Sequence, residues 1–416
     1  MTAVVDGIRG LQARTFASLS NPNFRLFMSG QSVSLTGNWM QTIAQSWLVL
    51  ELSGSATAIG IVLALQTFPM LMLGPYGGVI ADRVDRRALM IGLQATSGLL
   101  ALVLGVLVVA DAIALWHVFV IAGLFGLAQC FENPARQAFI AELVGHGDLR
   151  NAISLNSTAG SVARAVGPAL AGATIAAGGL GICFLFNAVG YGAVVVSLVR
   201  LDVSSLITAP GVGRVKRQMR DGLAYVRSET KLLAPLLMMA LVGCLTYEFH
   251  VVFPIVAAQT FGADAQMYGF MTTAMAIGAV GGGLLMSAWG RTGVRPLLAS
   301  CTVFGLALVA AAASPTLWFL LGVLIAVGMC SVSFAVTVSS SLQLEADPAM
   351  RGRVMSLWSV AFIGSSAVGA PVAGWVCQEW GGRAGLLLGA FTCFTATVLG
   401  AVLFVRDRPT TTRVLE

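Results

Sequence analysis

The stretch ALMIGLQATSGLLALVLGVLVVA, from Ala88 to Ala110, contains no charged residue. A helix of about 20 apolar residues crosses the roughly 30 Å of hydrocarbon in a bilayer, so this stretch predicts a membrane-spanning helix. Similar apolar runs fall at about 24–50, 56–80, 113–131, 152–177, 180–200, 232–259, 267–289, 296–313, 316–343, 354–377 and 384–405. Together with the first stretch they predict twelve spans.

The composition of the chain also indicates that lipid is its solvent. Of its 416 residues, 57% are hydrophobic and 10% are charged, whereas soluble domains carry about 25% charged residues. So little charge cannot cover a water-facing surface. Only helices and closed barrels span lipid, and the long runs lack the alternation of barrel strands. We therefore expect an all-α polytopic membrane protein.

The positions of the basic residues predict the topology. If the N-terminus lies in the cytoplasm, then all of the 24 lysines and arginines fall inside except Arg164, within a span, and Arg383, outside. Positive residues favour cytoplasmic loops, so we expect both termini in the cytoplasm of a bacterium and the spans in its cytoplasmic (inner) membrane. The net charge of +6 follows from this bias and does not indicate nucleic-acid binding.

The longest loop divides the spans into six and six. We expect an N-terminal six-helix bundle at 1–200, a cytoplasmic linker with a short amphipathic helix at 201–231, and a C-terminal six-helix bundle at 232–416. An internal repeat supports this division, because similar residues recur about 200 positions apart. They are Glu142, Arg150, Ser154, Gly167 and Pro168 in the first half, and Glu345, Arg351, Ser356, Gly369 and Pro371 in the second.

The sequence GVIADRVDRR, from Gly78 to Arg87, joins the second and third predicted spans. Glycine permits a close helix crossing, a carboxylate can cap a helix N-terminus, and arginines can hold carboxylates or lipid phosphates. The sequence resembles the signature loop of the major facilitator superfamily, and the resemblance covers essentially the whole chain. It implies the twelve-helix fold of that superfamily, transport by alternating access, and a cytoplasmic gate formed by Gly78, Asp82, Arg83, Asp85, Arg86 and Arg87.

The second half carries a weaker counterpart of this loop. Aligning Gly283 with Gly78 puts Ser287 in the place of Asp82 and Arg291 in the place of Arg86. The carboxylate is missing there, so we expect the gate contacts to be asymmetric.

The fifth span resembles the glycine-proline motif of antiporters in this superfamily, through Arg164, Gly167, Pro168 and Gly172. Asp85, where the signature loop usually has glycine, is similar to a drug- and siderophore-export branch that includes macrolide exporters and the enterobactin exporter. These resemblances imply export coupled to protons. A helix in which glycine and proline serve packing alone is the other interpretation.

Ionisable residues within the spans are the candidates for proton coupling. A charge at the bilayer centre costs at least ~2.5–3.5 kcal/mol, and few residues qualify. Glu248 lies inside the seventh span, Glu132 lies near the inner end of the fourth, and His250 is a weaker candidate. An interfacial carboxylate at the end of the span is the alternative interpretation for Glu248.

A polar face on the first span predicts part of a substrate cavity. Asn38, Gln41, Thr42 and Gln45 recur at helical spacing in an otherwise apolar helix. Later spans offer Thr246, Trp358 and Phe362, and aromatic groups suit hydrophobic ligands.

We expect a proton antiporter that exports small amphipathic or hydrophobic compounds, such as drugs, siderophores or metabolites. A uniporter or a proton symporter for nutrient uptake is the alternative, and a membrane-embedded enzyme or a receptor is a further one. The sequence indicates no enzyme, because the three histidines are scattered and no catalytic motif occurs. We expect no cofactor and no metal. The expected partners are a small-molecule substrate, protons and membrane lipid, with no nucleic acid. We expect the protein to be a monomer.

The predicted topology is tested by reporter fusions. Fusions at Asp111 and Asp264 should report the outside, and fusions at Asp85 and Asp347 the cytoplasm, because of the arginine bias. An external reporter at Asp85 would make the assignment wrong from the second span onward.

Overall fold

The computed structural model describes residues 15–81, 84–207, 218–290 and 292–406, and these ranges contain helices and no strand. This confirms the all-α prediction. The helices are η1 (Ala17–Ser20), α2 (Pro22–Ser53), α3 (Ala56–Ala81), α4 (Arg86–Val109), α5 (Leu115–Gly178), α6 (Leu180–Val199), η2 (Val203–Ser205), α7 (Gln218–Ser228), α8 (Thr230–Leu245), α9 (Phe249–Ile255), η3 (Val256–Thr260), α10 (Ala265–Trp289), α11 (Val294–Ala312), α12 (Leu317–Glu345), α13 (Arg351–Ser359), η4 (Val360–Gly364), α14 (Ser366–Trp380) and α15 (Gly382–Arg406).

Ten helical segments in the described ranges are long and apolar enough to cross a membrane. They include ten of the twelve predicted runs. The other two runs, 24–50 and 152–177, lie in α2 and in the second part of α5, beyond the non-helical Gly145. Polar side chains lower the hydropathy of both, for example Gln41 in α2 and Asn156 in α5. The count of twelve spans therefore stays a prediction.

Contacts between residues divide the chain into two compact units. The first comprises Met1–Gly54, Phe68–Gly213 and Asp264–Thr273, and the second comprises Ser55–Thr67, Arg214–Ala263 and Ala274–Glu416. Helix α3 therefore begins in the second unit and α10 begins in the first. The predicted division at 1–200, 201–231 and 232–416 concerns duplicated halves, and it stays a prediction.

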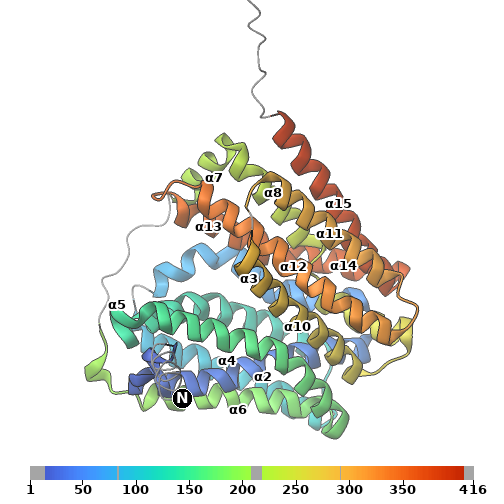
Figure 1. The fold of residues 1–416 in the computed structure, drawn as a ribbon. Coiled ribbons are helices and arrows are strands. Elements are labelled where there is room, and N and C mark those ends of the chain that lie inside the picture. Colours follow the sequence, from blue (N-terminus) through green and yellow to red (C-terminus); the bar gives the residue numbers. More distant parts are fainter. Residues whose placement is uncertain (1–14, 82–83, 208–217, 291, 407–416) are drawn as a thin grey trace, which may run out of the picture. The chain divides into compact units, whose positions relative to one another are not determined.

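The first unit is built on α2, which packs against α5 and α6, while α4 packs against α6 (Figure 1). A buried cluster in this unit contains Phe24, Phe27 and Phe139, none of which is exposed. The rings of Phe27 and Phe139 meet edge to face at 5.8 Å. Aromatic packing of this kind joins α2 to α5 close to the start of α2.

The second unit is built on α8, which packs against α12 and α15, while α11 packs against α12 and α15. Helix α10 crosses α12 very closely, because an added Cβ at Gly278 would overlap the carbonyl oxygen of Ile325, and one at Gly328 would overlap that of Met275. Small residues allow such crossings between membrane helices, where van der Waals contact is the main attraction.

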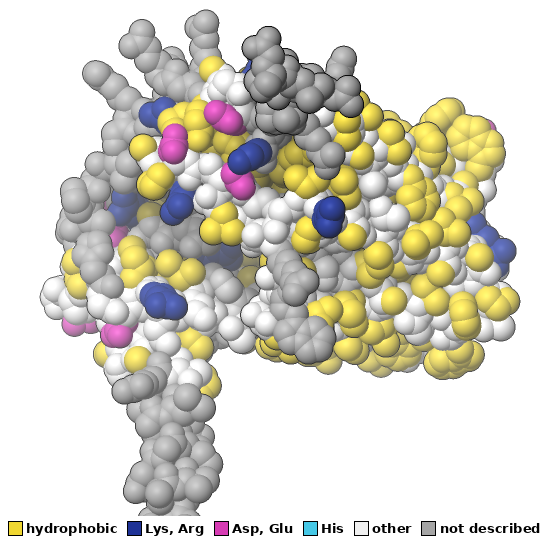
Figure 2. Space-filling model, turned by 45° about the horizontal axis from the view of Figure 1, so that its top comes forward, with side chains coloured by type: hydrophobic (Ala, Val, Ile, Leu, Met, Phe, Trp, Pro, Cys, Tyr) yellow, Lys and Arg dark blue, Asp and Glu magenta, His cyan; other side chains and the backbone are white. Residues whose placement is uncertain are grey.

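Many large apolar side chains lie on the surface of the isolated chain. Leu284 is 66% exposed and Phe391 is 69% exposed. Figure 2 shows one face on which hydrophobic side chains cover a broad area, while most of the Lys, Arg, Asp and Glu side chains gather in one region. Surfaces of this kind suit lipid, in which a charged side chain is costly.

The short helix α7 lies in the predicted linker. It packs against α13, where Gly222 approaches Arg353 and the buried Val226 faces inward. The hydroxyl of Tyr225 accepts a hydrogen bond from the amide of Asp347 at 3.2 Å. The linker is thus fastened to the turn between α12 and α13.

Candidate functional site

The loop before α4 holds two of the predicted gate residues in defined contacts. Asp85 is the N-cap of α4, and its carboxylate accepts hydrogen bonds from the amides of Arg87 at 2.9 Å and Ala88 at 3.2 Å. Arg86 forms an ion pair of 2.5 Å with Glu142 of α5, and the two side chains are only 9% and 15% exposed. The start of α4 is therefore tied to α5 by a pair that is largely shielded from solvent.

Arg87 reaches the end of a third helix. Its Nε donates to the carbonyl of Leu198 at 2.8 Å and its Nη2 to that of Val199 at 3.1 Å. The last carbonyls of a helix lack amide partners within it, and a cation is favourable at this end of the helix dipole. Arg87 thus caps α6.

The structure describes no side-chain contacts for the other three predicted gate residues. Gly78 lies near the end of α3, and Asp82 and Arg83 lie outside the described residues. The gate role of the loop stays a prediction.

The glycine-proline motif of α5 forms close helix crossings. A Cβ at Gly167 would lie 2.5 Å from the Cβ of Trp39, and one at Gly172 would lie 2.9 Å from the carbonyl oxygen of Gln266. An added Cβ at Gly269 would likewise lie 2.5 Å from the carbonyl oxygen of Pro168. The guanidinium of Arg164 lies over the ring of Trp39 at 5.1 Å, a cation–π contact that joins α5 to α2.

The polar face of α2 is bonded to α6. The hydroxyl of Tyr191 donates to Asn38 Oδ1 at 3.0 Å, and it accepts from Gln129 Nε2 at 3.3 Å. Asn187 Nδ2 donates to Gln41 Oε1 at 2.8 Å. These side chains form a chain of polar contacts from α2 through α6 to α5.

The remaining two residues of this face differ from each other. The hydroxyl of Thr42 turns back to the carbonyl of Asn38 in its own helix at 2.9 Å, so it is satisfied locally. Gln45 is buried, with 4% of its surface exposed.

Glu132 is buried but paired. Its carboxylate lies 3.4 Å from Arg136, one helical turn along α5, and it accepts from Gln94 Nε2 of α4 at 3.2 Å. A cation and an amide donor already occupy this carboxylate, and breaking a buried ion pair is costly.

Glu248 lies where the seventh predicted span breaks. Helix α8 ends at Leu245 and α9 begins at Phe249, with Glu248 as the N-cap of α9. The residue is 1% exposed. Ser366 is its polar neighbour, but neither carboxylate oxygen has a partner at hydrogen-bonding distance and angle. Glu248 is therefore a buried carboxyl group without a cation at ion-pairing distance in the described part of the second unit.

The break is surrounded by aromatic side chains. The ring of Tyr247 meets that of Phe362 edge to face at 5.0 Å, and Trp358 stacks on Phe362 at 5.4 Å. The Tyr247 hydroxyl donates to the carbonyl of Ser331 at 2.7 Å. The indole Nε1 of Trp358 is buried without a hydrogen-bond partner, so this aromatic cluster keeps one unused donor.

The other predicted residues of this region lie beside the break. The hydroxyl of Thr246 donates to the carbonyl of Gly389 in α15 at 3.1 Å. His250 lies in the first turn of α9. The aromatic cluster and Glu248 thus lie at the junction of α8 and α9 and on α13 and η4, while the Asn38 network belongs to the first unit.

Three residues of these clusters did not emerge from the sequence. Asn187 and Tyr191 could have been found, because they are polar side chains one turn apart in an apolar span. Tyr247 gave no signal, because neither glycine nor proline marks the break at Thr246–Glu248. Among the described residues, no group of three or more His, Cys, Asp or Glu side chains could hold a metal ion.

Comparison with known proteins gives consistent results. The model of the transmembrane secretion effector family matches residues 13–412. Macrolide efflux protein A of Streptococcus pyogenes is 26% identical over 346 residues, which are 80% of this chain and 84% of that protein. The staphyloferrin A transporter of Staphylococcus aureus is 25% identical over 62% of this chain and 64% of its own. The putative bacilysin exporter BacE of Bacillus subtilis is 25% identical over 66% and 68%.

Solved structures share the fold. The nucleoside transporter NupG superposes with a TM-score of 0.72 at 14% identity, over 92% of this chain and 99% of its own. A bacterial homologue of the iron transporter ferroportin, in an inward-facing state, superposes with a TM-score of 0.70 at 15% identity, over 92% and 98%. At such identities the likeness concerns the fold alone.

The ion pair of Arg86 and Glu142 is tested by a double-mutant cycle. Arg86→Gln and Glu142→Gln should each lower the apparent melting temperature of the purified protein, because each leaves a shielded charge unpaired. The double substitution should lower it by less than the sum, with a coupling of about 0.5–3 kcal/mol. The matched control is the cycle of Lys231→Gln and Glu345→Gln, whose side chains are 65% and 47% exposed and whose coupling should be near zero. Strict additivity in the first cycle would contradict the assigned pair.

Proposed function

We propose, given that the chain belongs to the transmembrane secretion effector family of the major facilitator superfamily, that this transporter exports small amphipathic or hydrophobic compounds. It does so by proton antiport with alternating access, through twelve spans in two six-helix halves. The membrane is the bacterial inner membrane and both termini are cytoplasmic. Relatives named as a macrolide efflux protein and a putative bacilysin exporter support the direction and the class of substrate.

One observation carries the proposal of proton coupling: the carboxyl group of Glu248 is buried, and no cation of the described residues lies at ion-pairing distance from it. A coupling group must bind a proton in one state of the transport cycle and release it in another. Glu132 is less suited, because Arg136 and Gln94 already occupy its carboxylate. Glu248 has no such partners, so water or a cationic substrate that reaches it can change its protonation.

The helix break gives this exchange a structural basis. Discontinuous helices in secondary transporters place free backbone groups beside substrates and ions near the membrane midplane. The break is also adjacent to the π-helical segment η4 through the contact of Tyr247 with Phe362, and π-helical turns are frequent at functional sites. A conformational change at the break would therefore alter the surroundings of the Glu248 carboxyl group and of the aromatic cluster at the same time.

The aromatic cluster supports the proposed class of substrate. Tyr247, Trp358 and Phe362 offer ring faces and edges, and the Trp358 indole offers a donor. A ligand with an apolar body and a few acceptors suits such a surface. In the first unit, the amides of Asn38 and Gln41 are candidates for polar contacts, although their present partners are Tyr191 and Asn187.

Glu248→Gln tests the coupling in inside-out vesicles that carry an imposed proton gradient. The variant should still bind a macrolide probe but should lose gradient-driven accumulation, because an amide cannot exchange a proton at neutral pH. Glu379→Gln is the matched control, since it makes the same change at an exposed position of the second unit, and its accumulation should equal that of the natural protein. Undiminished accumulation by Glu248→Gln, with an unchanged number of protons per substrate, would assign Glu248 a structural role.

A further inference from the structure

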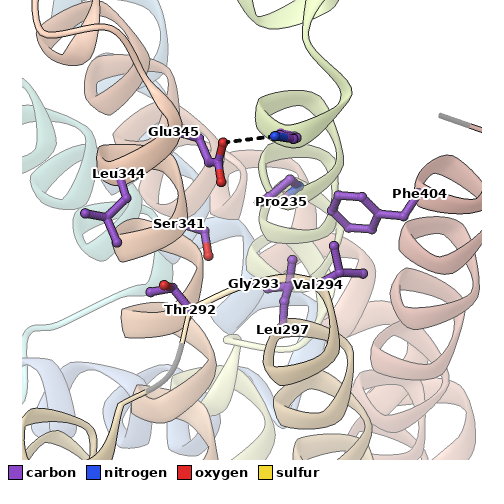
Figure 3. Close-up of a pocket in the computed structure, with 10 residues that line it drawn as sticks. Pro235, Thr292, Gly293, Val294, Leu297, Ser341, Leu344, Glu345 and Phe404 are labelled. Atoms are coloured by element: carbon purple, nitrogen blue, oxygen red, sulfur yellow. Dashed lines mark ion pairs between the residues drawn. The ribbon is translucent and has the colours of Figure 1, made fainter. Parts of the chain in front are cut away.

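A cavity of about 150 Å³ lies at one end of the second unit. It is bounded by the first turns of α8 and α11 and by the last turns of α12 and α15 (Figure 3). Lys231 and Glu345 lie on one side and form an exposed ion pair of 3.7 Å. Pro235, Leu297 and Phe404 supply an apolar wall. The cavity thus has an ion pair at its margin and apolar side chains in its interior.

The internal repeat explains why space is left here. The alignment of Gly283 with Gly78 pairs Thr292 with Arg87. In the first unit, the Arg87 guanidinium donates to carbonyls at the end of α6. In the second unit, the shorter Thr292 lines an open cavity beside Phe404.

The first turn of α11 also lacks the carboxylate that caps its counterpart. In the first unit, Asp85 accepts hydrogen bonds from two amides at the start of α4. The N-cap of α11 is Gly293, which has a φ of 127° and supplies no side-chain hydrogen bond. Gly293 and Val294 both line the cavity. Open amides at a helix N-terminus, with the positive end of the helix dipole, form a site suited to an anion.

A second and independent feature points to a ligand. Ser341 of α12 lines the cavity, is 7% exposed, and its hydroxyl has no hydrogen-bond partner among the described residues. Buried hydroxyl groups are nearly always hydrogen-bonded, so the Ser341 hydroxyl is available to donate to an acceptor of a bound ligand. Figure 3 shows Ser341 between Glu345 and Thr292, on the side of the cavity that faces α11.

We propose that this cavity binds the phosphate group of a phospholipid. The amides at the start of α11, the Ser341 hydroxyl and the Lys231 ammonium are its donors. The Glu345 carboxylate stays paired with Lys231 at the margin. An acyl chain or glycerol lies against Leu297 and Phe404, and this apolar wall is the reason to favour a lipid over a free phosphate ion. Under the proposed topology, this end of the second unit faces the cytoplasmic leaflet, where anionic headgroups are abundant.

The test uses the purified full chain, stripped of lipid in detergent, and native mass spectrometry. Three probes are titrated: dioleoylphosphatidylglycerol, dioleoylglycerol with the same chains but no phosphate, and inorganic phosphate. The proposal expects binding of the first probe, at least about tenfold weaker binding of the second, and no displacement by millimolar amounts of the third. Saturable phosphate binding that displaces the lipid would identify a free-phosphate site and would overturn the lipid assignment.

Variants place the binding in this cavity. Ser341→Ala and Lys231→Gln should each weaken lipid binding about tenfold, as expected for the loss of one hydrogen bond to a charged group. Ser339→Ala is the control, because Ser339 lies on the same helix and donates to its own backbone at the Val336 carbonyl. Thr292→Phe fills the space without adding a charge and should abolish binding. Unchanged lipid binding in well-folded Ser341→Ala and Thr292→Phe, judged by a single symmetric gel-filtration peak, would overturn the proposal.

Discussion

Hydrocarbon offers no hydrogen-bond partner to a peptide group, and this constraint decides how the chain can fold. Each spanning segment must satisfy its own backbone, so it must be a helix. Where a helix is interrupted, nearby groups must replace the lost partners. At the break of the seventh span, the carbonyl of Glu248 accepts from the amides of Val251 and Val252, and the hydroxyl of Thr246 reaches the Gly389 carbonyl. The break is tolerated because it lies inside the second unit, and for the same reason it buries a carboxyl group.

The corresponding helix ends of the two units are held by different contacts. In the first, guanidinium groups join the start of α4 to Glu142 within α5 and to the end of α6. In the second, the ion pair of Lys231 and Glu345 is long and exposed, and a cavity remains beside it. Exposed pairs contribute little to stability, about 0–1 kcal/mol. The helix ends at this side of the second unit are thus held by fewer strong contacts than those of the first. A bound ligand could supply part of the missing contact.

The sequence predicted the features that follow from solvent and from local chemistry. The apolar runs located the helices because a backbone in lipid must satisfy its own hydrogen bonds. A helix cap was expected from Asp82, because carboxylates accept from free amides, but the cap that the structure describes is Asp85. The sequence could not show where helices meet. Arg86 finds its partner Glu142 at a distance of 56 residues, and Asn187 meets Gln41 at 146 residues. The break at Glu248 was also hidden, because no glycine or proline stands at Thr246–Glu248 itself. The gate role of Asp82 remains a prediction from resemblance.

The central claim is that outward movement of substrate is exchanged for protons, and lumenal pH in proteoliposomes tests it most directly. Vesicles are loaded with a transported probe that has no titratable group and with a pH-sensitive dye, and then diluted into probe-free buffer of the same pH. Antiport predicts that the lumen becomes acidic as the probe leaves, in proportion to the amount transported, and that a protonophore removes the pH change. Probe efflux without a pH change, or with a lumen that becomes alkaline, would contradict the account, because it would indicate uniport or symport.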